Sequence, residues 1–379
     1  MKITEINGYE VSCRLPEPQG NSTGYFDSRS SLIVSITLED GATGWGETWQ
    51  SPAAAAGFVR EVLAPSLIGK DSSAPARLWR KMMEFVGYDR RGASIMAVSA
   101  VDMAIWDASA KSASVPLSQL MGGALRDRVR PYASGPFLKP GTDQYRDFSR
   151  DAERYLRAGF TAIKMRMGTK PEADGRVARA MRELVGPDVY LMADLNEGFT
   201  AKAAERIAVA MADSNLLWIE EPILPDDLAG YKRLIASLPM PLAGGEALCG
   251  LGAFRDFISA GALDIVQPDL AICGGITEAL RIAALADAFD VAVIPHVWGT
   301  GINYYASLQF VSILPSKRGA GLDFPLYEYD YSPNPLRSAF GDIALEKDGM
   351  IPIPEKPGIG IDVRRELFAE FIRHSWRVA

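Results

Sequence analysis

The fold is decided by TAIKMRMG (residues 161–168), DVYLMADLN (188–196) and LLWIEEP (216–222), three short apolar runs that amphipathic stretches separate. The alternation extends in both directions, with further runs at RPYASGPF (130–137), MPLAGGE (240–246), LDIVQPDL (263–270), VAVIPHVWG (291–299) and FPLYEYD (324–330). Eight strands that alternate with helices predict an α/β fold, a parallel sheet closed into a (β/α)8 barrel of the TIM type. An open doubly wound sheet is the alternative, but its usual glycine-rich turn after the first strand is missing.

The first hundred or so residues have a different texture. Residues 3–11 and 30–47 alternate as strands, and helical stretches follow at 53–69, 74–87 and 93–113. We predict an N-terminal α+β capping domain over residues 1–125, the barrel over 126–330, and a C-terminal segment, 331–379, that packs back on both. His374 is expected in a charged, solvated C-terminal helix.

Composition bounds the class of protein. The chain has 379 residues, 48% of them hydrophobic, which is enough for a large core. Its net charge of −7 is spread along the chain, so nucleic acid and anionic membranes are not expected as partners. Three distant cysteines indicate a reducing compartment, and the start resembles no signal peptide. We therefore expect a cytoplasmic globular protein.

Polar residues stand near the ends of seven of these runs, from the second onward. They are Lys164 and Arg166, then Asp194, Glu220, Glu246, Asp269, His296 and Glu328. From Lys164 onward the steps are 23 to 32 residues, about one strand–helix unit each. In a barrel all these positions lie at the C-terminal mouth, where barrel enzymes place their chemistry.

Three successive strands each end in a carboxylate: Asp194, Glu220 and Glu246. Each could be an ordinary cap or turn residue, but together they would repel by about 4 kcal/mol per pair at close range. A hard divalent cation offsets that repulsion, and an all-oxygen ligand set favours Mg²⁺ over Zn²⁺. We therefore expect one Mg²⁺ per subunit. Glu220 is preferred to Glu221, which points to the other side of its strand.

Two further pairs complete the predicted site. Lys164 and Arg166 share one side of their strand, so they are expected to face the carboxylates and an anionic substrate. His296 lies one strand after Asp269, and a carboxylate within reach of an imidazole fixes its tautomer and raises its basicity.

These motifs, in this order, resemble the enolase superfamily, mandelate racemase subgroup. The resemblance rests on the Lys-x-Arg strand, ADLN, WIEEP, AGGE, the QPD aspartate, PHVWGTG and the later glutamate, and it extends to the GWGE turn and the AVSAVDMAIWD helix. Within the subgroup, YASGPF, GGITEALRIAALA and PHVWGTGINYYASLQF are similar to sugar-acid lactone cycloisomerases of the galactarolactone type.

The resemblance implies a shared first step, in which a base removes the proton α to a carboxylate and an enediolate forms. It implies that Asp194, Glu220 and Glu246 bind the metal, that Asp269 and His296 form an acid–base dyad, and that Glu328 hydrogen-bonds a substrate oxygen. Residues expected to contact the substrate at the mouth or from the cap are Asn196, Trp298, Tyr25, Phe26 and Trp49, with the loops around Tyr25 and Trp49 closing the mouth. Relatives commonly assemble, so a homo-oligomer is expected.

Arg166 departs from the Lys-x-Lys pattern of the racemases. Neutralising a guanidinium near pH 7 costs roughly 7 kcal/mol, so Arg166 is a poor second base. We expect Lys164 and Arg166 chiefly to stabilise the enediolate, and Arg166 as a base is the alternative. A racemase or epimerase of a 2-hydroxy acid needs two bases, whereas an elimination needs only one for the α-proton. The sequence thus favours a Mg²⁺-dependent dehydratase or cycloisomerase that gives a 2-keto-3-deoxy acid.

Two competing hypotheses come from different classes of protein. A non-catalytic barrel could bind a metal or a sugar acid. A phosphate-binding barrel enzyme could use GTG (299–301), although a tight turn explains these glycines equally well.

Overall fold

The computed structural model describes residues 1–317 and 325–379 and has a curled parallel sheet at its centre. Its strands pair in the order β11-β10-β9-β8-β7-β6-β5-β12. They are β5 (Pro131–Ser134), β6 (Ala162–Arg166), β7 (Tyr190–Asp194), β8 (Leu216–Glu220), β9 (Leu242–Gly244), β10 (Ile265–Val266), β11 (Ala292–Val293) and β12 (Tyr327–Tyr329). Phe324, the first residue of the eighth predicted run, lies outside the described residues.

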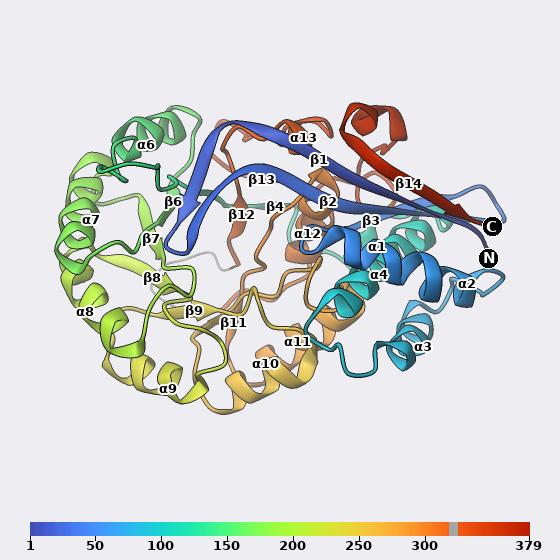
Figure 1. The fold of residues 1–379 in the computed structure, drawn as a ribbon, viewed down its shortest axis with the longest axis horizontal. Helices are drawn as coiled ribbons and strands as arrows, with labels where there is room; N and C mark the ends of the chain where they lie inside the picture. Colours follow the sequence, from blue (N-terminus) through green and yellow to red (C-terminus); the bar gives the residue numbers. More distant parts are fainter. Residues whose placement is uncertain (318–324) are drawn as a thin grey trace.

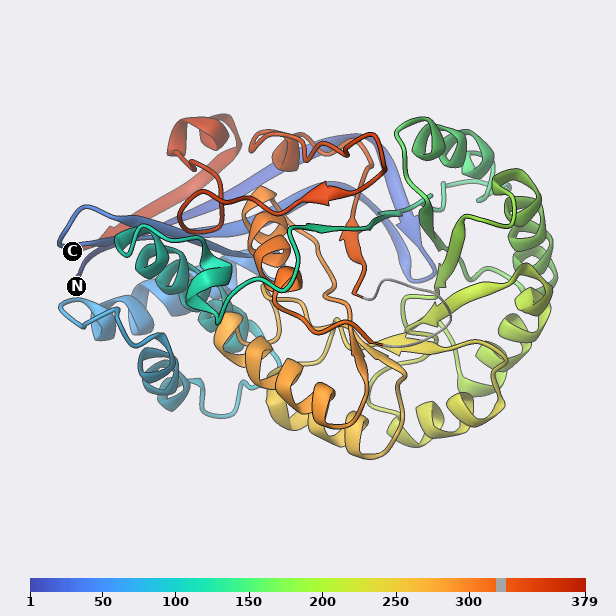
Figure 2. The ribbon, with the colours of Figure 1, turned by 180° about the vertical axis from the view of Figure 1, so that it is seen from behind.

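Helices surround this sheet on its outer side (Figures 1 and 2). They are α6 (Phe148–Arg157), α7 (Pro171–Val185), α8 (Ala201–Met211), α9 (Leu228–Ser237), α10 (Gly250–Ser259), α11 (Ile276–Ala288) and α12 (Gly301–Ser312). The predicted barrel class is confirmed, because an open doubly wound sheet would carry helices on both faces. No strand pairing joins β11 to β12 within the described residues, but the Val297 amide donates to Glu328 across that gap (3.1 Å).

Strand alternation separates two kinds of buried residue. One apolar cluster takes a residue from each barrel strand or its immediate flank, including Tyr132, Met192, Trp218 and Ile265. Residues on the other face of each strand, such as Ile163 and Met165 of β6, belong to the large core under the helices. Lys164 and Arg166 lie on the same face of β6 as Ala162, which belongs to the first cluster.

The N-terminal part forms an antiparallel sheet in the order β14-β1-β2-β3. Its strands are β1 (Ile3–Asn21), β2 (Gly24–Leu38), β3 (Thr43–Thr48) and the C-terminal β14 (Ile372–Val378). Packed with it are α1 (Pro52–Phe58), a π-helical turn (Val59–Leu63), α2 (Ala64–Leu67), α3 (Pro75–Val86), α4 (Ala93–Ser112) and α5 (Leu117–Leu120). Helix α4 is long and apolar enough to cross a membrane, but 83% of that stretch is buried, as in the core helix of a soluble protein.

The C-terminal segment returns to both parts of the molecule. β13 (Ile351–Pro352) pairs with β4 (Arg128–Val129), and β14 pairs with β1 from Ile6–Val378 to Val11–Ile372. The remaining elements are α13 (Pro335–Ser338) and the 3₁₀ turns Ala212–Ser214 and Arg365–Phe371.

Two local expectations are wrong. His374 is exposed as predicted, but it lies in β14 rather than in a helix, because that segment completes the edge of the capping sheet. The predicted loop around Tyr25 and Phe26 is a strand, since β1 and β2 form one long hairpin. Pro16 and Pro18 interrupt the strand pattern in the sequence, so the hairpin was not predicted. The pairing register shifts between Arg14 and Gln19, because the prolines lack amide donors.

Candidate active site

The carboxylates of Asp194, Glu220 and Glu246 meet at the C-terminal ends of β7, β8 and β9. One ligand oxygen from each lies within 4.8 Å of the others. Asp194 and Glu220 are fully buried, and Glu246 Oε2 has no hydrogen-bond donor among the described residues. Converging carboxylates with an unsatisfied oxygen are the donor set of a hard divalent cation, so this triad fits a metal. Glu221 is outside it, and its side chain accepts from the Gly245 amide (3.2 Å).

Lys164 and Arg166 face this group from β6. Lys164 Nζ contacts Glu220 directly, lies 2.8 Å from Glu328 Oε1, and is fully buried. The Arg166 guanidinium contacts Asp194 and also donates to Ser134 Oγ (2.9 Å). The two cations thus face inward and offset buried negative charge.

Asp269 and His296 form a hydrogen-bonded pair on the opposite side of the site. His296 Nδ1 lies 2.8 Å from Asp269 Oδ2, which leaves Nε2 to face Glu246 (3.3 Å). Asp269 also accepts from Trp49 Nε1 (2.9 Å) of the cap and from Asn303 Nδ2 (3.0 Å) of α12. Four donors in all, with the Ala271 amide (2.7 Å), therefore hold this carboxylate in one orientation.

Charges within the site shift its pKa values. Burial alone would lower the pKa of His296, but the charges of Glu246 and Glu328 and the hydrogen bond to Asp269 raise it to about 9. Burial alone would raise the pKa of Glu328. The positive charges of Lys164, His296 and Arg166 outweigh burial and hold this pKa well below its usual range. Burial alone would lower the pKa of Arg166, but the negative charges of nearby carboxylates outweigh burial and raise this pKa. A cation held by the triad would oppose the effect of Glu246 on His296.

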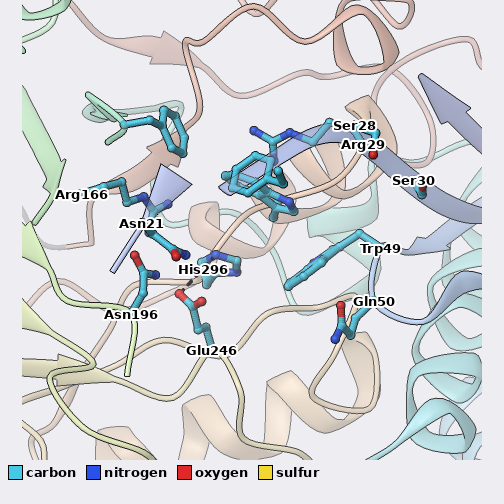
Figure 3. A pocket seen from close by; sticks show the side chains of 13 residues that line it. Asn21, Ser28, Arg29, Ser30, Trp49, Gln50, Arg166, Asn196, Glu246 and His296 are labelled. Carbon is cyan, nitrogen blue, oxygen red and sulfur yellow. Dashed lines mark ion pairs between the residues drawn. The ribbon is translucent and has the colours of Figure 1, made fainter. Parts of the chain in front are cut away.

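A cavity of about 360 Å³ opens above these residues (Figure 3). Its lining includes Arg166, Glu246 and His296 from the barrel, while the remaining residues predicted to bind the metal or to act in catalysis are fully buried and are not among the lining residues. Of the five predicted substrate contacts, Asn196, Trp298, Phe26 and Trp49 line the cavity. Tyr25 is not among the lining residues: it is 44% exposed, and its hydroxyl donates to the Lys139 carbonyl (3.2 Å).

Sequence reasoning missed several residues of the site. The cavity is also lined by Asn21, Ser28, Arg29, Ser30, Gln50 and Phe137. Most come from the hairpin of β1 and β2, whose tip reaches the barrel where Ser22 Oγ donates to the Leu195 carbonyl (2.5 Å). Asn303 was also missed, although its helical position shortly after PHVWG was a usable signal.

The GTG turn (299–301) has a structural role. Glu47 of β3 is fully buried and accepts from the amides of Thr300 (2.9 Å) and Asn303 (2.7 Å) at the start of α12. Gly299 has φ 108°, and a Cβ there would lie 3.1 Å from the Glu47 carboxylate. The donors that a phosphate would need at this helix end are already used by Glu47, so the phosphate-binding hypothesis loses its support.

Fold and site together define a class: a barrel enzyme with a carboxylate metal triad, inward cations and an acid–base dyad beneath a capping domain. Family comparison agrees. Residues 4–122 match the mandelate racemase / muconate lactonizing enzyme N-terminal domain, and residues 147–367 match the enolase C-terminal domain-like family. The chain belongs to the enolase superfamily, mandelate racemase/muconate lactonizing enzyme subgroup.

Three similar proteins illustrate this membership. The chain is 37% identical to a D-galactarolactone cycloisomerase of Agrobacterium fabrum, over 98% of this chain and 99% of that protein. It is 31% identical to a D-galactonate dehydratase of Verminephrobacter eiseniae, over 100% and 96% of the two. A crystal structure of a racemase from Streptomyces coelicolor with bound magnesium superposes with a TM-score of 0.87 at 30% identity, over 98% of each chain. The chain is therefore an enzyme, which excludes the non-catalytic barrel.

Proposed function

We propose that this enzyme removes the α-proton of a sugar acid or its lactone with bound Mg²⁺, one ion per subunit, and forms a 2-keto-3-deoxy acid by β-elimination or lactone opening. The observation that carries the proposal is that the carboxylate triad, the two cations and the Asp269–His296 pair contact one another in one cluster, and that Glu246, Arg166 and His296 of this cluster line one cavity. The named activities of the cycloisomerase and dehydratase relatives support this substrate class.

His296 is the residue that would take the α-proton. Its Nδ1 is held by Asp269, so Nε2 is the nitrogen directed to the cavity side of the site. Mg²⁺ bound by Asp194, Glu220 and Glu246 would act as a Lewis acid that makes the α-proton of the substrate more acidic. Lys164 and Arg166 would stabilise the negative charge of the enediolate.

For Glu328 we propose a different role from the one that the resemblance implies. To donate a hydrogen bond to a substrate oxygen it must carry a proton, but here it pairs with Lys164 (2.8 Å) and its Oε2 accepts from the Val297 amide. In this arrangement Glu328 orients the Lys164 ammonium toward the site. The proposed catalytic contribution of Glu328 is therefore made through Lys164.

Elimination is preferred to racemisation because racemisation needs a second base and Arg166 is a poor one. Arg166 is buried among carboxylates, and these favour its charged form. A guanidinium that remains protonated stabilises an enediolate but does not remove a proton from the second face of the substrate.

The decisive experiment is a screen of aldonic acids, aldaric acids and their lactones for 2-keto products, with Mg²⁺ and with EDTA. We expect product from at least one acid, only with the metal, together with deuterium uptake at the α-carbon in D₂O. Uptake of deuterium with inversion and without 2-keto product would instead establish a racemase or epimerase. Neither product nor exchange with any acid would refute the proposal.

A further inference from the structure

Arg29 adds a cation to the cavity lining, which also contains Arg166. It lies on β2, its side chain is 6% exposed, and it belongs to the cavity lining. Its guanidinium stacks on the Trp298 ring, 3.5 Å from the ring centre. In Figure 3 this group extends from its strand toward the cavity on the side away from Glu246 and Asn196.

Most hydrogen-bond donors of Arg29 have no partner. A guanidinium has five N–H groups. Nη2 uses its two on Gln19 Oε1 (2.7 Å) and Asp330 Oδ2 (3.1 Å). Nε and Nη1, which carry the other three, are buried without a hydrogen-bond partner among the described residues. Leaving such donors unsatisfied is unfavourable, so an acceptor from a ligand would offset that cost.

The group remains a cation at neutral pH. Burial lowers the pKa of Arg29 to about 10, against the opposing charge of Asp330. A buried cation with three open donors suits an anionic oxygen group better than a hydroxyl, because charged hydrogen bonds are the stronger ones. The cavity of about 360 Å³ has the size of a small-molecule site.

We propose that Arg29 binds a second carboxylate at the distal end of the substrate, so that the enzyme prefers sugar diacids or their lactones to monoacids. This inference rests on the proposed function, in which the first carboxylate, or the lactone carbonyl, lies at the metal triad. Arg29 is then a specificity-determining residue, while Ser28, Ser30 and Asn21 offer polar groups to the hydroxylated carbons between the two ends.

The test compares two acids that differ only at the distal carbon. D-Galactarate carries a carboxylate there and D-galactonate a hydroxymethyl group, and each is tried as free acid and as lactone with Mg²⁺. The main variant is R29M/D330N, which removes both members of the ion pair. The control is K139M/E17Q, which removes another cation–carboxylate pair (2.7 Å) whose residues do not line the cavity.

In the wild type we expect kcat/KM to be at least tenfold higher for the diacid. In R29M/D330N the diacid-to-monoacid ratio should fall ten- to a hundredfold, as expected for lost hydrogen bonds to a charged group, and in K139M/E17Q it should not change. A wild-type ratio near one, or a ratio that R29M/D330N leaves unchanged, overturns the proposal. If R29M/D330N does not fold, R29Q/D330N replaces it, and an unchanged ratio in R29Q/D330N overturns the proposal equally.

Failure of the proposed function is distinguishable from failure of this inference. If the wild type exchanges the α-proton of no acid, the proposed function is refuted. Calorimetric binding of D-galactarate and D-galactonate with Mg²⁺ then decides the role of Arg29. Tighter binding of the diacid that is lost in R29M/D330N supports it, and equal binding of the two acids overturns it.

Discussion

Single residues of β6 show how a strand pattern acquires chemical meaning. Lys164 and Arg166 alternate with Ile163 and Met165, as in many exposed strands, yet all are buried. Burial of a charge is tolerated only when it is paired, and both cations contact carboxylates from other strands: Arg166 contacts Asp194 of β7, and Lys164 contacts Glu220 of β8. The residue pattern therefore specifies an internal ionic cluster and not a solvated face.

Replacing His296 with Asn tests the assignment of the base. Asn keeps a polar side chain near Asp269 but has no titratable nitrogen, so deuterium exchange at the α-carbon should fall by about two to four orders of magnitude. Exchange is measured by NMR in D₂O, with Mg²⁺ binding measured in parallel to confirm an intact triad. Exchange at the normal rate would instead assign the base to Arg166 or Lys164.

The neighbouring glutamates of IEEP give a matched pair for the metal site. Glu220 belongs to the triad and Glu221 does not. E220Q removes a charged ligand, so its Mg²⁺ affinity should fall at least tenfold, whereas E221Q should change the affinity by less than about threefold. Isothermal titration with MgCl₂ measures both. Equal losses in the two variants would contradict the assignment of Glu220.

At the scale of elements, the cap and the barrel meet through buried carboxylates. Glu47 of β3 accepts from the start of α12, and Asp102 of α4 accepts from the Thr277 amide (2.8 Å) near the start of α11. Helix N-termini favour negative charge, so these contacts fix the cap over the mouth. The contact between β3 and α12 also lies next to the two donors to Asp269, because Trp49 directly follows β3 and Asn303 belongs to α12.

The buried carboxylate of Glu47 predicts a pH effect on stability. Burial raises its pKa to about 7, against the hydrogen bonds from Asn303, Ser31 and Thr300. The folded state thus binds the proton more tightly than the unfolded state, and stability falls as pH rises from about 4.5 to 7, by about 3 kcal/mol at most. Relative to E47Q, which does not titrate there, the wild type should lose stability over this window.

Thermal unfolding of both proteins at pH 5, 6, 7 and 8 measures this difference. The wild-type advantage over E47Q should be largest at pH 5 and smallest at pH 8. Asp102 has its pKa raised to about 7 by burial as well, so D102N should give the same trend. A difference that does not vary with pH would show that the helix-end hydrogen bonds keep Glu47 charged throughout.

Predictability also differed between elements. The barrel strands and their order were predictable because each is a short apolar run followed by a helix with 3.6-residue periodicity. The extension of β1 and β2 over residues 12–29 was not, because prolines and polar residues mask the alternation there. The boundaries at residues 125 and 330 stay predictions.

At the scale of the whole molecule, the metal should contribute to stability. Asp194, Glu220 and Glu246 come from three strands, so an ion that binds them links these strands in the folded state only. Binding at about 100 times the dissociation constant stabilises the fold by about 2.7 kcal/mol. We expect EDTA to lower the unfolding temperature by several degrees and Mg²⁺ to restore it. An unfolding temperature that is the same with EDTA and with Mg²⁺ would argue against a bound ion.

Assembly and location are also properties of the whole molecule. The expected homo-oligomer and the cytoplasmic location both stay predictions. Sedimentation analysis of the purified protein decides the first.

The sequence by itself determined the barrel class and which strand ends carry carboxylates, cations and the histidine, because periodicity and strand-end position are written in neighbouring residues. Only the tertiary structure decided which residues the cap contributes. Arg29 meets Asp330, and Trp49 meets Asp269, across hundreds of positions in the chain. Such contacts depend on how two packed units are placed against each other, and no local pattern of side chains encodes that placement.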